Sequence, residues 1–419
     1  MKLTVVGGGS TYTPELMDGL ARLQGQLAFD EVWLTDPDRD RLALVAGISR
    51  RMFAREGHPG RVVASSDLVA AVEGADAVLI QLRVGGQRAR QGDETWPHRC
   101  SCIGQETTGP GGFAKALRTV PVILDVAETV RKHAKPDAWI VDFTNPVGIV
   151  TRALLEAGHR AVGLCNVAIT LQRTYAQLLQ VDASRVHLQH VGLNHLTWER
   201  GVLVDGTDML PVMLKEHLAE VAESVELPPS LVRFLGAVPS SYLRYYYEHD
   251  KVLSSQLSAP TRAEAVMAIE ETLLKEYADP HVDYKPEALK GRGGAFYSEA
   301  AVELFGSLLG GEEGRHVVNL RNDGVLPFLP DDHVIEVPAI VNASGMTALP
   351  IDEVPADMAG LIGHVAGYER LALDAAVHGG RDRVMRAMLA HPLVGQYERA
   401  ELLTDLLIAE NRDHLAWAL

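Results

Sequence analysis

The feature that most constrains the fold is an alternation of short apolar runs with longer helical patterns through residues 1–165. The expected strands cover residues 3–6, 32–35, 61–64, 76–82, 139–143 and 161–164. The expected helices between them include residues 14–23, 40–55 and 114–133. Strands that alternate with helices usually pair in parallel, because a parallel connection needs a crossover. The alternation therefore predicts an α/β fold with a Rossmann-like, doubly wound parallel sheet.

The pattern changes after about Cys165. Helical segments then dominate, and β-rich pieces are expected at residues 185–192 and 333–341. A chain of 419 residues exceeds one ordinary domain. We therefore expect a parallel-sheet domain at residues 1–165 and a C-terminal α+β, mostly helical domain at residues 166–419.

Charge and apolar content limit the function classes. The formal net charge of −16 argues against nucleic-acid binding, which needs a basic surface. No run of 18 apolar residues is present, so no membrane span is expected. The chain has three cysteines, namely Cys100, Cys102 and Cys165. This number is small and odd, so it does not indicate a disulfide framework. We expect a cytoplasmic protein.

A glycine-rich loop follows the first expected strand and precedes a helix. It begins with Gly7, Gly8, Gly9, Ser10 and Thr11. Glycines let the backbone approach a pyrophosphate, and a helix N-terminus favours anions. Asp36, at the end of the second strand, suits an adenosine ribose, which favours NAD over NADP. The third glycine of the usual fingerprint is replaced by Tyr12, and the alternative is a tight structural turn.

Three further polar segments are expected as loops: residues 83–90, 103–112 and 142–146. Arginines such as Arg90 suit a phosphate or a polyol, although a solvated basic turn would look the same. Glu106 is a candidate carboxylate for tuning a neighbouring base, or else a surface acid. Asn145 can donate and accept hydrogen bonds beside a nicotinamide, or else begins the next helix.

Cys165 and His195 are candidate ligands of a divalent metal, because a thiolate and an imidazole suit a borderline-soft ion. Two ligands are too few for a structural zinc site. On spacing alone, a buried thiol and a core histidine are the better interpretation. Tyr242 lies in an aromatic cluster at residues 241–247, which usually indicates packing. Its phenol could act as a base only with a lowered pKa.

Together these segments resemble glycoside hydrolase family 4. The matching segments occur in family order at residues 7–12, 83–90, 104–112, 143–146, 165–166, 192–195, 241–247 and 261–263. The resemblance implies NAD as cofactor and a divalent metal, usually Mn²⁺, held by Cys165 and His195. It implies that Tyr242 is the base and that Glu106 raises its basicity.

The same resemblance places Arg90, Asn145, Asn166 and Arg262 at substrate positions. A segment at residues 292–298, which begins with Arg292, is similar to the phospho-β-glucosidase branch. Asn166 stands where the phospho-α-glucosidase branch has an aspartate cast as proton donor. An amide cannot donate a proton as an acid, so Asn166 supports the β branch and leaves the acid unassigned between metal-bound water and Glu106.

The implied activity is hydrolysis of 6-phospho-β-glucosides to glucose 6-phosphate and an aglycone. Most glycosidases use two carboxylates, whereas this family oxidises C3, removes the C2 proton, eliminates the leaving group, adds water and reduces the ketone. The alternatives are an NAD-dependent dehydrogenase of a 2-hydroxy acid and an NAD-binding sensor. The expected ligand is a small phosphorylated disaccharide or glucoside. The expected assembly is a homo-oligomer, a dimer or tetramer.

Overall fold

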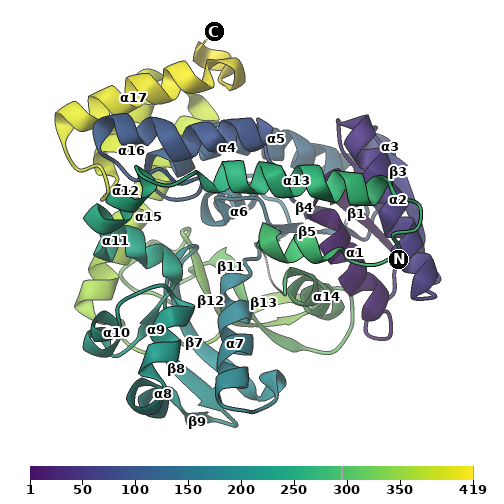
Figure 1. The fold of residues 1–419 in the computed structure, drawn as a ribbon, viewed down its shortest axis with the longest axis horizontal. Coiled ribbons are helices and arrows are strands. Elements are labelled where there is room, and N and C mark those ends of the chain that lie inside the picture. The colour runs from purple at the N-terminus through teal and green to yellow at the C-terminus, as the bar shows by residue number, and fades with distance from the viewer. Residues whose placement is uncertain (294–295, 419) are drawn as a thin grey trace.

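A mixed β-sheet of thirteen strands runs through the computed structural model, which describes residues 1–293 and 296–418 (Figure 1). Six parallel strands form one half, in the order β6-β5-β4-β1-β2-β3. Their bounds are β1 (Lys2–Val6), β2 (Glu31–Thr35), β3 (Arg61–Ser65), β4 (Ala77–Ile80), β5 (Trp139–Asp142) and β6 (Ala161–Gly163). The predicted doubly wound parallel sheet is confirmed.

Helices connect these strands and cover the parallel half. They are α1 (Thr13–Arg22), α2 (Arg39–Arg55), α3 (Leu68–Val72), α4 (Gly86–Thr95), α5 (Gly109–His133) and α6 (Val147–Glu156). The core lies between sheet and helices, where strand side chains such as Val5, Leu34 and Leu79 are fully buried. Burial of this apolar surface is the main favourable term for the fold.

The second half of the sheet is antiparallel. Its strands are β7 (Val186–Leu193), β8 (Leu196–Val204), β9 (Thr207–Asp208), β10 (Val238–Pro239), β11 (Gly314–Arg321), β12 (Val334–Asn342) and β13 (Gly345–Ala348). β11 pairs with β6 through Asn319 and Gly163, and β12 pairs with β7 through Glu336 and Gly192. The sheet therefore continues past residue 165, and the two-domain division stays a prediction.

Helices of the second half pack against both halves. They are α7 (Val167–Leu178), α8 (Leu210–Glu216), α9 (Leu218–Ser224), α10 (Pro229–Leu235), α11 (Arg244–Tyr247), α12 (His249–Gln256), α13 (Arg262–Ala278), α14 (Tyr297–Leu308), α15 (Ala356–His378), α16 (Arg381–Ala390) and α17 (Tyr397–Asn411). α13 lies against α2 and α4, and α15 lies against α5 (Figure 1). None of the helices in the described ranges is both long and apolar enough to cross a bilayer.

Two predicted loops are partly helical. α4 begins at Gly86, inside the predicted loop at residues 83–90, and α5 begins at Gly109, inside the predicted loop at residues 103–112. The buried face of α4 consists of polar side chains, namely Gln87, Arg90, Asp93 and Glu94. Hydrophobic periodicity cannot reveal a helix whose buried face is polar.

Candidate functional site

The loop after β1 is shaped for close approach of a ligand. Gly7 has a φ of +85°, and a Cβ there would lie 2.4 Å from the Gln81 carbonyl oxygen. The Gly7 and Gly8 amides both donate to the Thr35 carbonyl oxygen, at 3.0 and 2.9 Å. The loop is therefore fixed to β2, directly before α1, as a pyrophosphate-binding turn requires.

Asp36 and Glu270 hold this loop from two sides. The Gly9 amide donates to Asp36 Oδ2 at 3.1 Å, and burial raises the pKa of Asp36. Thr11 Oγ1 donates to Glu270 Oε1 at 3.1 Å, although Glu270 lies on α13, far along the chain. Glu270 is a site residue that the sequence did not indicate, because nothing local to α13 points to a partner in the first loop.

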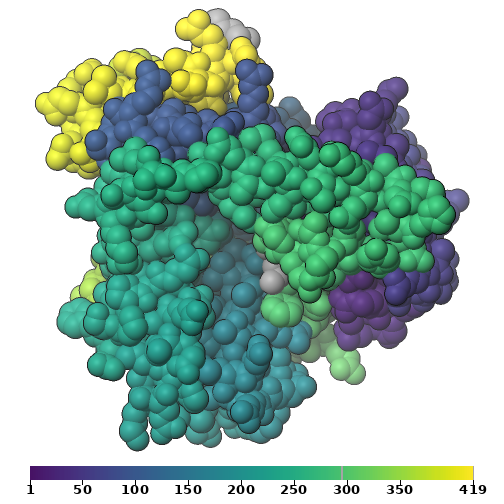
Figure 2. Space-filling model, in the orientation of Figure 1, coloured from purple at the N-terminus to yellow at the C-terminus, as the bar shows by residue number. Residues whose placement is uncertain are grey.

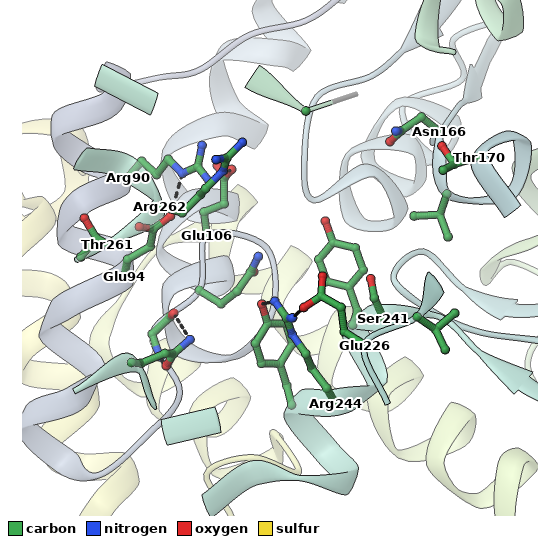
Figure 3. Close-up of a pocket in the computed structure, with 18 of the residues that line it drawn as sticks. Arg90, Glu94, Glu106, Asn166, Thr170, Glu226, Ser241, Arg244, Thr261 and Arg262 are labelled. Carbon is green, nitrogen blue, oxygen red and sulfur yellow. Dashed lines mark hydrogen bonds and ion pairs between the residues drawn. The ribbon is translucent and has the colours of Figure 1, made fainter. Parts of the chain in front are cut away.

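A cavity of about 670 Å³ opens between first-half residues, on α4 and at 104–106, and second-half residues that include the starts of α7 and α13. Figure 2 shows the surface hollowed between the teal and the green parts of the chain. Its lining includes Arg90, Glu106, Asn166, Tyr242 and Arg262. Arg90, Glu106 and Arg262 gather on one side, and Asn166 lies on the opposite side (Figure 3). The structure thus brings five predicted site residues to one cavity.

A cluster of three cations and two carboxylates, here called the cationic cluster, contributes Arg90, Glu94 and Glu106 to one wall of the cavity. Its members are Arg83, Arg90, Lys115, Glu94 and Glu106. Glu106 accepts hydrogen bonds from Arg83 and from Lys115 Nζ at 2.7 Å, and it forms an ion pair with Arg90 Nη2 at 3.2 Å. Burial alone would raise the pKa of Glu106, but these charges outweigh it and hold the pKa well below its usual value.

Cys165 and His195 lie together just behind the cavity wall formed by Asn166 and Tyr242. Cys165 follows β6, and His195 occupies the turn between β7 and β8 with a φ of +65°. Cys165 Sγ lies 3.6 Å from His195 Nε2. A zinc-like divalent ion bonds sulfur at about 2.3 Å and nitrogen at about 2.1 Å, which together span about 3.6 Å at a tetrahedral angle. The pair therefore fits two ligands of one metal ion.

The hydrogen bonds of His195 leave the correct nitrogen free for a metal. The Thr107 hydroxyl donates to Gln105 Oε1 at 2.8 Å and lies 3.0 Å from His195 Nδ1. Because a hydroxyl has one proton, the Thr107 oxygen then accepts from Nδ1–H. Burial lowers the pKa of His195 to about 4, so the ring is neutral and Nε2 carries a lone pair toward Cys165. The sequence pattern did not indicate that Thr107 or Gln105 would orient His195.

Burial keeps the Cys165 thiol protonated by raising its pKa to about 12. A coordinating metal reverses this preference, because the thiolate is the ligand. Within residues 1–293 and 296–418, no group of three or more His, Cys, Asp and Glu side chains could hold a metal. A two-ligand site leaves positions open for a substrate.

Tyr242 stacks on His195, with ring centroids 3.7 Å apart and an interplanar angle of 5°. It lies in the 3₁₀ turn Ser241–Leu243, which follows a short strand held against β8. Burial, and then Cys165, raises the pKa of Tyr242 well above its usual value, and the charge of Glu106 adds to this. A neutral phenol of this kind needs a nearby cation before it can act as a base.

Asn145 and Arg292 lie away from the cavity lining. Asn145 Oδ1 is buried and has no hydrogen-bond partner in the described part of the chain. Arg292 Nη2 pairs with Glu270 Oε1 at 3.1 Å, and its Nε lies 3.5 Å from Thr11 Oγ1. Arg292 therefore belongs to the nucleotide-loop side, whereas Arg262, whose Nη2 donates to Gly291 O at 2.7 Å, lines the cavity. Residues 294 and 295 of the segment at 292–298 lie outside the described residues.

Comparison with models of known protein families identifies the family of this chain. The model for family 4 glycosyl hydrolases matches residues 2–181, and the model for their C-terminal domain matches residues 190–394. The chain belongs to the family 4 glycosyl hydrolases. The predicted family is therefore confirmed, and most of the chain, including Cys165, His195 and Tyr242, lies within the two matches.

Family 4 relatives match over nearly the whole chain. A probable 6-phospho-beta-glucosidase of Bacillus subtilis is 36% identical, covering 99% of this chain and 97% of its own. The 6-phospho-beta-glucosidase of Escherichia coli is 33% identical, covering 98% and 96%. A solved structure of the Thermotoga maritima 6-phospho-beta glucosidase with manganese, NAD+ and glucose-6-phosphate is 33% identical, with a TM-score of 0.91 and 99% of each chain covered.

Proposed function

We propose that this protein hydrolyses 6-phospho-β-glucosides to glucose 6-phosphate and an aglycone, with NAD and a divalent metal as cofactors. One observation carries the proposal: a single cavity has Arg90 and Arg262 on one side and Tyr242, backed by the Cys165–His195 pair, in its wall. The relatives named for 6-phospho-β-glucosides match at 33 to 36% identity, which supports this substrate class.

The roles of the cofactor residues follow from their positions. Gly7, Gly8, Gly9, Ser10 and Thr11 would hold the NAD pyrophosphate, and Asp36 the adenosine ribose. Cys165 and His195 would hold the metal. When bound, NAD would accept and return a hydride at the sugar, and the metal would supply positive charge beside the reacting oxygens and Tyr242.

The remaining residues would bind the sugar and move its C2 proton. Arg90 and Arg262 would bind the phosphate by charge-assisted hydrogen bonds. Arg292 is a weaker candidate, because it pairs with Glu270 beside the nucleotide loop. Asn145 and Asn166 would bind sugar hydroxyls. Tyr242 would remove the C2 proton, and the ionised Glu106 would raise its basicity. A carboxyl held ionised is a poor proton donor, so Glu106 is disfavoured as the acid that Asn166 cannot supply.

We further propose that the protein works in the cytoplasm as a homo-oligomer, a dimer or tetramer. The formal net charge of −16 is compatible with this placement. Sedimentation of the full chain measures the assembly directly, and a monomer at all concentrations would contradict it.

The experiment that tests the activity is turnover of a chromogenic 6-phospho-β-glucoside with and without NAD and Mn²⁺. We expect release of the chromophore only when both are present, with no net NADH. Comparable kcat/KM for the plain β-glucoside would refute the phosphorylated substrate class. Stoichiometric NADH with a 2-hydroxy acid would instead support the alternative dehydrogenase.

A further inference from the structure

A buried polar network lies where the antiparallel strands meet, and the proposed catalytic roles do not use it. The anionic network, as we call it, comprises Glu199, His190, Glu336, Asn194 and Asn319. His190, Glu199 and Glu336 are 0%, 1% and 2% exposed, so water does not screen their charges. Glu336 is the residue of β12 that pairs in register with β7, and Asn319 is the residue of β11 that pairs in register with β6.

The network carries one excess negative charge. His190 Nδ1 lies 2.6 Å from Glu199 Oε1, and His190 Nε2 lies 3.0 Å from Glu336 Oε1. Only an imidazolium can donate from both ring nitrogens. Burial would lower the pKa of His190, but the two carboxylates outweigh it and raise the pKa to about 10. One imidazolium between two carboxylates leaves one negative charge in the interior.

Asn194 connects this charge to both proposed metal ligands. Its Nδ2 donates to Glu336 Oε2 at 2.8 Å, and its side chain lies beside the Cys165 thiol. Asn194 directly precedes His195, whose left-handed backbone directs the ring toward Cys165. One side chain therefore bridges the buried carboxylate and the thiol ligand and adjoins the imidazole ligand.

The excess negative charge of the network lies close to the two proposed ligands, because Glu336 holds the Asn194 side chain next to them. An uncompensated buried charge is costly, so the network favours a cation beside Cys165 and His195. The partners of a metal ligand commonly set its orientation and the affinity of the site.

We propose that Glu336, acting through Asn194, positions Cys165 and His195 and sets the affinity of their site for a divalent cation. This inference rests on the metal site of the proposed function. Glu336 and Asn194 are positioning residues, because they act through the ligands. A purely structural network predicts a different result: lower stability with unchanged metal affinity.

The test measures the Mn²⁺ dissociation constant of the full chain by the electron paramagnetic resonance signal of free Mn²⁺, without substrate. For Glu336→Gln and Asn194→Ala we expect about 10–100-fold weaker binding than wild type, the range usual for partners of metal ligands. Turnover should show a raised KM for Mn²⁺ with kcat largely restored at saturating metal. NAD affinity should stay unchanged.

Asn322→Ala is the matched control. Asn322 is a fully buried asparagine that donates to the Leu326 and Leu329 carbonyl oxygens, outside the anionic network. The Asn322→Ala substitution should lower the melting temperature of the protein and leave its Mn²⁺ affinity unchanged. If Glu336→Gln fails to fold, Asn194→Ala decides, because Asn194 is half-buried in a turn.

Wild-type Mn²⁺ affinity in Asn194→Ala or in folded Glu336→Gln would overturn the inference. A wild-type protein that binds no Mn²⁺ would instead contradict the metal site of the proposed function. The two failures are therefore distinguishable in the same titration.

Discussion

Two buried charge clusters act on His195, and they are built in opposite ways. In the cationic cluster, the Glu106 carboxylate is surrounded by two guanidinium groups and an ammonium group. In the anionic network, the His190 imidazolium lies between two carboxylates. Burial lowers the pKa of His195, and the charges of Glu336, Lys115 and Glu106 all act on the same ring.

The comparison shows that the ligand preference of each cluster follows from its ratio of cations to carboxylates. Three cations and two carboxylates leave the cationic cluster with one excess positive charge. That excess suits a phosphate, as the excess negative charge of the network suits a divalent cation. Buried glutamates thus belong to clusters of opposite ligand preference on either side of one reacting centre.

The largest expected effect is loss of a metal ligand. Cys165→Ser or His195→Ala should abolish metal-dependent turnover, because a two-ligand site keeps little affinity with one ligand. Turnover at limiting Mn²⁺ measures the effect, and NAD binding should persist. Cys102→Ser is the matched control, since Cys102 is also a buried thiol but lies outside the site. Full activity of either ligand variant would remove that residue from the metal site.

The next effect concerns Tyr242, which lines the cavity and stacks on His195. Tyr242→Phe keeps the stacked ring and removes the phenol, so kcat should fall by about 10²–10⁴-fold, as for loss of a positioned base. Tyr246→Phe, in the same aromatic cluster, should keep normal kinetics. Wild-type turnover in D2O should place deuterium at C2 of the product. A product without that deuterium would contradict the elimination route.

A smaller effect is expected at the cationic side. Arg262→Gln removes a charged hydrogen-bond donor and should raise KM for the phosphorylated glucoside by about 10-fold or more. Mn²⁺ affinity should not change, which separates the two ends of the cavity. Arg233→Gln, at an exposed arginine on α10, serves as control. An equal rise in KM for the plain glucoside would show that Arg262 does not bind the phosphate.

The smallest expected effect is on stability at alkaline pH. The folded pKa of His190 is about 10, against 6.5 for an unperturbed histidine. A raised pKa contributes stability that is fully present below 6.5 and is lost as pH rises through 10. The free energy of unfolding should therefore fall between pH 7 and pH 10, and less steeply in His190→Gln. Urea titrations across this range test it, and parallel curves for both proteins would place no charge on His190.

The sequence by itself determined the local features of this protein. The glycine loop, Asp36 and the strand–helix alternation follow from short-range backbone and hydrophobic patterns, and the structure places each as expected. The family resemblance predicts Cys165 and His195 as metal ligands and Tyr242 as the base. Their spacing alone favours a buried thiol, a core histidine and a packing tyrosine. The helix α4 was missed in part because its buried face is polar.

The tertiary structure decided which residues, far apart in the sequence, form buried hydrogen bonds and ion pairs with one another. Glu270 reaches Thr11, and Glu336 reaches His190 and Asn194, only because α13 packs beside α4 and β12 pairs with β7. A lone glutamate on a helix or strand usually indicates a solvated position. These glutamates are buried because a hydrogen-bonded or ionised partner from another part of the chain satisfies each one, and no short-range pattern encodes that partner.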